Sequence, residues 1–135
     1  MSSQESNRSE RLRAAQLGLI GEANGLIEAT EMARRLGVEL ESVFDLAKNA
    51  EILSVEYDGA AKFPVRQLAT AGGVLNGLAG VLQRLRSIGI EGWMTLDILC
   101  SKTPKFGLSP FELLEQGRVA EALENATAYE NQGCP

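Results

Sequence analysis

The sequence predicts a mainly α protein with a small β-hairpin wing, in which an N-terminal unit containing the hairpin precedes a small helical module. Three observations support this prediction. Apolar residues recur at helical spacing along most of the chain, one short stretch alternates apolar and polar residues around an Asp-Gly pair, and a small-residue segment separates two halves. The predicted divisions are a tail with a short helix at 1–24, the first unit at 25–68 and the module at 69–135.

The N-terminal part begins with a Ser-, Glu- and Arg-rich stretch of about ten residues, which we expect to be frayed. A short helix is predicted over 10–20, and the glycines of 21–25 interrupt it. Two further helices are predicted over about 28–36 and 39–49. Gly37 is the stop signal between them.

A β-hairpin is predicted directly after these helices. Residues 53–57 alternate apolar and polar side chains, Asp58-Gly59 favours a tight turn, and 60–65 can form the return strand. Pro64 lacks an amide donor, so it suits an edge strand.

The C-terminal half begins at 71–80, a segment of small residues that predicts a junction. Helices are predicted over about 77–88 and 92–102, and a last pair over 109–130 is broken near Gly117. The start of that pair has a capping signature of Ser, then Pro, then Glu at the third helical position.

Composition argues against most enzyme classes. The chain has no histidine, so it lacks Ser-His and Cys-His nucleophile pairs and histidine metal sites. Its two cysteines, Cys100 and Cys134, cannot form a zinc centre or a disulfide framework on their own. We therefore expect no enzyme activity, no cofactor and no metal. A carboxylate-based enzyme is the most distant alternative.

Charge and hydropathy bound the location and the partners. The net charge is −5 and neither half is net basic, so any DNA contact has to come from a local patch. The sequence shows no signal peptide and no apolar run of membrane-spanning length. Together with the cysteine usage, this predicts a soluble cytoplasmic protein without membrane contact.

The segment 28–46 has the pattern of a helix-turn-helix. Ala33 is the small residue at the helix crossing, Gly37 turns the chain, and apolar residues occupy the buried positions, namely Met32, Leu36, Val38, Val43 and Leu46. The segment resembles the helix-turn-helix of many bacterial transcription regulators. The hairpin after it resembles the wing of a winged-helix or excisionase-like domain, and this resemblance implies DNA binding.

The predicted reading helix departs from that family pattern, because it offers Glu39, Glu41 and Asp45 where bases and phosphates favour cations and amides. The candidate DNA-binding residues are the basic and hydroxyl side chains nearby: Arg34, Arg35, Ser42, Lys48, Lys62 and Arg66. The alternative is that the arginines form a solvated face and that the fold serves protein contacts.

The second half resembles the toxin-binding module of Xre/MbcA/ParS-type antitoxins. The resemblance rests on the helix opened by Trp93, a Thr-Pro pair, the run from Phe106 to Leu114, and Gly117-Arg118-Val119 before the last helix. It implies that the protein binds and neutralises a cognate toxin and represses its own operon.

Candidate partner-binding residues are two aromatic side chains and three cations near the predicted loops: Trp93, Lys102, Lys105, Phe106 and Arg118. Trp93 is alternatively a core anchor, because a large ring dominates a small core. The leading prediction is therefore an antitoxin-like, homodimeric DNA-binding regulator. The alternative is an adaptor or small-ligand-binding module without DNA binding.

Overall fold

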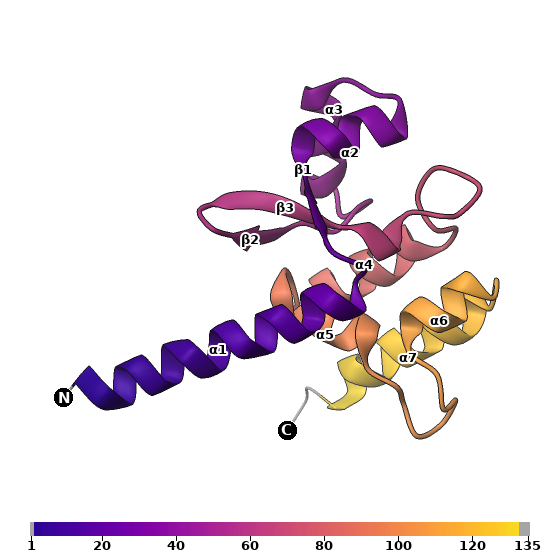
Figure 1. Ribbon diagram of the computed structural model, residues 1–135. Coiled ribbons are helices and arrows are strands. Elements are labelled where there is room, and N and C mark those ends of the chain that lie inside the picture. Colours follow the sequence, from indigo (N-terminus) through magenta and orange to yellow (C-terminus); the bar gives the residue numbers. More distant parts are fainter. Residues whose placement is uncertain (1, 133–135) are drawn as a thin grey trace.

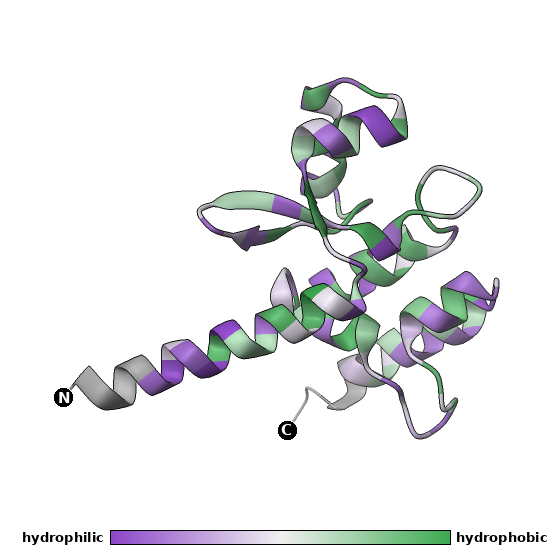
Figure 2. Ribbon diagram, viewed as in Figure 1, coloured by the Kyte–Doolittle hydropathy of each residue, from purple (hydrophilic) through white to green (hydrophobic). Residues whose placement is uncertain are grey.

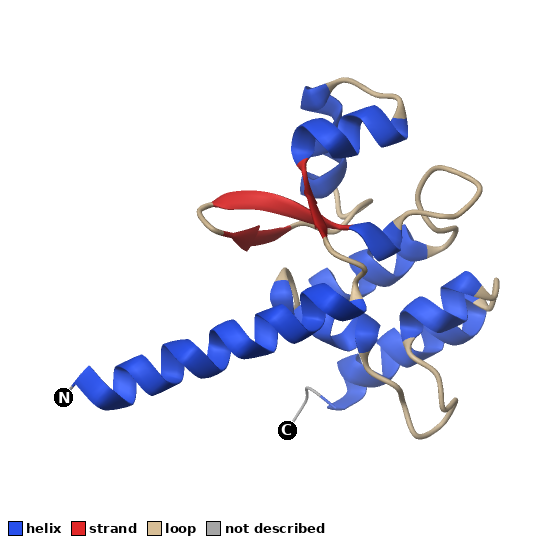
Figure 3. Ribbon diagram, viewed as in Figure 1, coloured by secondary structure: helices blue, strands red, loops and turns tan. Residues whose placement is uncertain are grey.

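The computed structural model describes residues 2–132 and the side chains of residues 7–129. Cys134 lies outside these residues. The described chain is mainly helical and contains one three-stranded antiparallel sheet, in agreement with the predicted class (Figure 3). In Figure 1, α2 and α3 lie at one end of the molecule, the sheet is in the middle, and α1 lies with α4 to α7 on the other side.

Helix α1 (Ser2–Glu22) is longer than the predicted helix over 10–20. The polar start, which we expected to be frayed, belongs to the helix, although good helix formers such as Glu5 and Arg8 alternate there with the weaker serine. The helix ends where expected, as Asn24 and Gly25 adopt positive φ angles of 64° and 98°. Its N-terminal half extends away from the rest of the molecule (Figure 1).

Helices α2 (Ala29–Leu36) and α3 (Leu40–Lys48) have bounds close to the prediction. Gly37 ends α2 in the left-handed region, with φ of 69°, which disfavours any residue that carries a Cβ atom. A small core joins the two helices to the sheet; its fully or largely buried members are Met32, Ala33, Val43, Ile52 and Phe63.

The hairpin consists of β2 (Val55–Tyr57) and β3 (Ala60–Pro64), as predicted. The sequence did not indicate β1 (Leu26–Glu28), which pairs with the other side of β3. The sheet order is β1-β3-β2, so the expectation that the return strand is an edge strand is wrong. Pro64 is tolerated because it is the last residue of β3, where the ladder ends.

A short 3-10 turn, η1 (Val65–Gln67), follows β3, and then come the four C-terminal helices. These are α4 (Leu78–Ser87), α5 (Trp93–Cys100), α6 (Pro110–Glu115) and α7 (Val119–Gln132). Helix α7 packs against α4 and α6, and α5 packs against α6 and α1. The predicted capping box at the start of α6 is present in full.

The main core takes side chains from both predicted units. Leu53 and Val55 precede or begin the hairpin, and they are buried in one cluster with the apolar faces of α4 to α7. Gln67 is fully buried at this junction. Its amide nitrogen donates to the carbonyl oxygens of Leu53 (2.9 Å) and Pro64 (3.1 Å), and its amide oxygen accepts from the Leu53 amide (2.7 Å). The two halves are thus joined by packing as well as by chain.

Across the described residues, no helix combines the length and the apolar character needed to cross a membrane.

Candidate functional site

The exposed face of α3 is apolar and acidic. Leu40 and Phe44, four residues apart, are 43% and 47% exposed, and Glu41 and Asp45 lie beside them in the exposed class. Ser42 is half-buried on the same helix. A helix that reads DNA presents cations and amides to phosphate and base edges, and this face presents one cation, Lys48, at the last residue of the helix.

Arg34 and Arg35, at the end of α2, share one carboxylate. Both arginine Nε atoms donate to Glu31, at 2.9 and 2.8 Å, and Arg34 adds a second ion-pair contact through Nη2. These hydrogen bonds, with Coulombic attraction, lower the pKa of Glu31 to about 2. Two cations facing one anion leave this surface with one net positive charge.

The remaining predicted DNA-binding cations do not lie together. Lys62, on β3, points to Glu28 on the neighbouring strand at 3.5 Å. Lys48 is exposed at the last residue of α3. We expected Arg66 on the return strand, but it lies in η1, directly after that strand.

Arg66 is engaged inside the protein. Its guanidinium donates to both carboxylate oxygens of Glu115 on α6, at 2.9 and 3.1 Å, and to the carbonyl oxygen of Glu22 at 3.3 Å. It also lies over the Phe111 ring at 5.3 Å. Hydrogen bonding to Glu115 raises the pKa of Arg66. The arginine therefore connects α1, η1 and α6.

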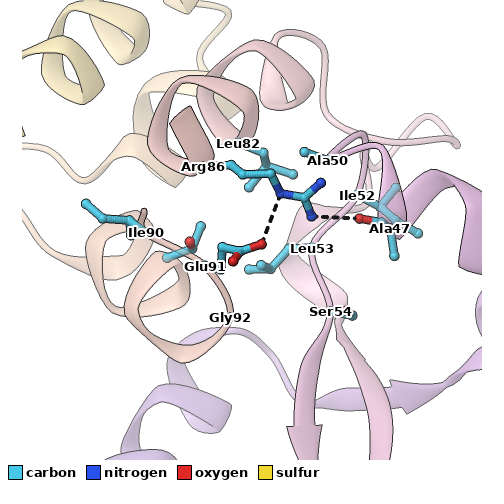
Figure 4. A pocket seen from close by; sticks show the side chains of 11 residues that line it. Ala47, Ala50, Ile52, Leu53, Ser54, Leu82, Arg86, Ile90, Glu91 and Gly92 are labelled. Atoms are coloured by element: carbon cyan, nitrogen blue, oxygen red, sulfur yellow. Dashed lines mark hydrogen bonds and ion pairs between the residues drawn. The ribbon is translucent and has the colours of Figure 1, made fainter. Parts of the chain in front are cut away.

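A second arginine, Arg86 on α4, connects the C-terminal helices to α3. Its guanidinium donates to the carbonyl oxygens of Ala47 (3.1 Å) and Lys48 and forms an ion pair with Glu91 at 3.1 Å. These carbonyls belong to the last turn of α3, where a cation also meets the negative end of the helix dipole. This arginine and Leu53 are among the residues that line a cavity of about 280 Å³ (Figure 4).

Trp93 connects the hairpin to α5. Its indole Nε1 donates to the carbonyl oxygen of Glu56 on β2 at 2.9 Å, and its ring meets Tyr57 edge to face, with centroids 5.9 Å apart. Arg13 of α1 lies over the Tyr57 ring, 4.4 Å from its centroid, and forms an ion pair with Asp58 at 3.1 Å. The tip of the hairpin is thus attached to α1.

A groove of about 760 Å³ runs between α1 and α5. Leu12 and Met94, 59% and 61% exposed, line it together with Trp93 and Lys102. The Cys100 thiol also lines the groove, and burial, reinforced by the Glu22 carboxylate, raises its pKa to about 11. The thiol is therefore protonated at neutral pH and a poor nucleophile.

A separate cavity of about 500 Å³ lies between the loop after α5 and helix α7. Phe106 and Tyr129 line it, and Lys105 at its edge pairs with Glu124 and lies 5.5 Å from the centre of the Phe106 ring. Asn125 also lines the cavity. This residue is 7% exposed, and its amide nitrogen Nδ2 is buried without a hydrogen-bond acceptor in the described part of the chain. An unpaired buried donor costs free energy that a bound acceptor would recover.

The structure thus separates the predicted partner-binding residues into three places. Trp93 and Lys102 line the groove beside α1, and Lys105 and Phe106 line the cavity beside α7. Arg118 lies at the turn before α7 and pairs with Glu121 at 2.8 Å. The three cations among these residues are thus divided over three places.

Two further residues of these surfaces were not predicted. Arg86 gave no sequence signal, because its partners are carbonyl oxygens more than thirty residues away. Asn125 lies among small and apolar residues of α7. A polar side chain on such a face was the available signal.

No family model matches the sequence, and no curated protein matches it. Among solved structures, the chain is similar to the NMR structure of Rv2175c, with a TM-score of 0.69. The match covers 77% of this chain and 80% of that chain, at 19% sequence identity. At that identity the likeness shows a shared fold, and it is silent on function.

Proposed function

We propose that α2, α3 and the hairpin form a winged helix-turn-helix. Gly37 turns the chain between the two helices, the small residue Ala33 is buried at their crossing with Val43, and the hairpin follows directly. The order of helix, turn, helix and wing is that of DNA-binding domains in this class.

We propose further that the protein is an antitoxin-like regulator that acts by binding a partner protein through its C-terminal module. The observation that carries this proposal is the cavity beside α7, because a buried Asn125 donor without an acceptor borders an aromatic wall. A polypeptide supplies what this cavity lacks. Backbone carbonyls are acceptors for Asn125, and an apolar side chain fits against Phe106 and Tyr129.

The test combines stability with capture of a partner. Tagged protein is used to recover proteins from the source cells, and the expected partner co-elutes in stoichiometric amount and is toxic when produced alone. Asn125→Leu removes the unpaired donor, so we expect a melting temperature equal to or above that of the wild type. We expect the same variant to lose the partner, whereas exposed Gln83→Leu retains it. A stable Asn125→Leu variant that binds the partner normally contradicts the proposal.

DNA binding by the winged helix-turn-helix is the second proposed function, and the order of its elements is the observation that favours it. Arg66 and Lys62 are half-buried and engaged by carboxylates, whereas Arg34, which pairs with Glu31, and Lys48 are exposed and are the cations to test. If DNA is bound there, alanine at both positions lowers affinity and reduces the salt slope by about one for each phosphate that is no longer neutralised. Fluorescence anisotropy with a duplex from upstream of the gene measures both.

An adaptor that contacts protein through α3 is the alternative to DNA binding. The exposed pair Leu40 and Phe44, flanked by carboxylates, favours it. Absence of binding to any upstream duplex at low salt, together with loss of a captured protein in Phe44→Ser, supports the adaptor over the DNA-binding function.

A further inference from the structure

Helix α1 carries a seam of side chains at alternating intervals of four and three residues: Arg8, Leu12, Ala15, Leu19 and Glu22. This spacing places all five on one face of a helix, as in the seam of a coiled coil. In the monomer the seam is open. Arg8, Leu12, Ala15 and Glu22 are exposed, and Leu19 is half-buried at the edge of the main core.

Nothing in the described chain covers the first part of α1. The residues of α1 that line the groove begin at Leu12, and Arg13 holds the hairpin tip. Arg8 and Arg11 make no ion pair within the described residues. Isolated helices shorter than about 12–15 residues are marginal in water, so the uncovered part of α1 before Leu12 is stabilised only through the rest of the helix, and a further contact would stabilise it.

We infer that α1 of a second copy of this chain lies antiparallel along this seam and makes the protein a two-fold symmetric dimer. The two charged ends of the seam are complementary about Ala15. With Ala15 at the two-fold axis, Arg8 of one copy lies opposite Glu22 of the other, seven residues to either side. Leu12 then lies opposite Gly18, at which an added Cβ would meet no atom within 4 Å.

The apolar and charged surroundings match this occupant. Leu12 and Met94 are exposed large apolar side chains of the groove, on α1 and α5, and Figure 2 shows apolar positions recurring along the C-terminal half of α1. The groove carries the carboxylates of Glu22 and Asp97, and both raise the pKa of Cys100. An antiparallel second α1 brings its Arg8 to this end of the groove, opposite Glu22, so the one cation of the seam meets these carboxylates.

The association state of the full chain tests this inference. We expect sedimentation equilibrium to give twice the chain mass of 14.5 kDa. Ala15→Glu places two carboxylates at the two-fold axis and yields a monomer, while its circular dichroism stays native because glutamate is a good helix former. Ala120→Glu makes the same substitution at an exposed position of α7 and remains a dimer. A wild type that sediments as a single chain at about 100 μM, or a dimeric Ala15→Glu, overturns the inference.

A charge exchange tests the antiparallel register separately. Arg8→Glu sets two like-charged pairs against each other and raises the dimer dissociation constant roughly ten-fold. The double variant Arg8→Glu with Glu22→Arg restores opposite charges and returns the constant to near the wild-type value. Failure of the double variant to recover overturns the register. Neither experiment depends on partner or DNA binding.

Discussion

Replacing Gln67 by methionine tests how the hairpin is joined to the C-terminal helices. The substitution nearly preserves volume but removes three hydrogen bonds, of 2.7, 2.9 and 3.1 Å, at a fully buried position. Each such bond contributes about 1 kcal/mol net, and a stranded buried backbone group costs about 1–3 kcal/mol. The greater apolar character of methionine offsets part of this loss. We expect the free energy of unfolding to fall by about 3 kcal/mol.

Urea unfolding, followed by circular dichroism, measures this change. For an m value of about 2 kcal/mol/M, a loss of 3 kcal/mol lowers the midpoint by about 1.5 M. Gln83→Met is the matched control, since Gln83 is exposed and makes one long bond of 3.5 Å to Asn49. It should change stability by no more than about 0.5 kcal/mol. If Gln67→Met loses less than about 1 kcal/mol at an unchanged m value, the buried amide is not what holds this junction.

Three further predictions concern local contacts. The folded-state pKa of Glu31 is lowered from 4.5 to about 2, so its ion pairs stabilise the protein fully above pH 4.5, and this stabilisation disappears as the pH falls through about 2. In Glu31→Gln, the melting temperature should depend less on pH between these two values. Gly77→Ala should cost about 2–4 kcal/mol in urea unfolding, because the new Cβ comes within 2.5 Å of Val119 at a φ of 88°, whereas Gly37→Ala, in open space at a φ of 69°, should cost only about 1 kcal/mol. Trp93→Phe keeps a ring but loses the 2.9 Å bond to the hairpin, so we expect about 1 kcal/mol less stability, and an unaltered midpoint speaks against that bond.

The helices were predictable because their signals are local. Gly37 and the capping residues Ser109 and Glu112 mark helix ends within a few residues of sequence, and the structure places helix ends there. Strand β1 was not predictable. Three residues are too few to show alternation, and β1 exists because it pairs with a strand more than thirty residues later.

The surroundings of the candidate binding residues were less predictable than the elements that carry them. Arg66 was recognised as a cation of the hairpin region, but its partner Glu115 lies 49 residues away. The sequence leaves Trp93 open between a core anchor and a partner-binding residue. It packs against the main core, lines the groove and bonds the hairpin, so both descriptions apply to its position. Such pairings are set by the tertiary fold and leave no periodic trace in the chain.

The shared main core has a consequence for how ligands act on this molecule. Because Leu53 and Val55 are buried among the C-terminal helices, the hairpin cannot melt without exposing the apolar interior of the other half. Both halves then unfold in one cooperative transition. A ligand that binds the folded form of either half therefore stabilises both halves. DNA bound at α3, or a protein bound at α7, would each raise the melting temperature of the entire chain.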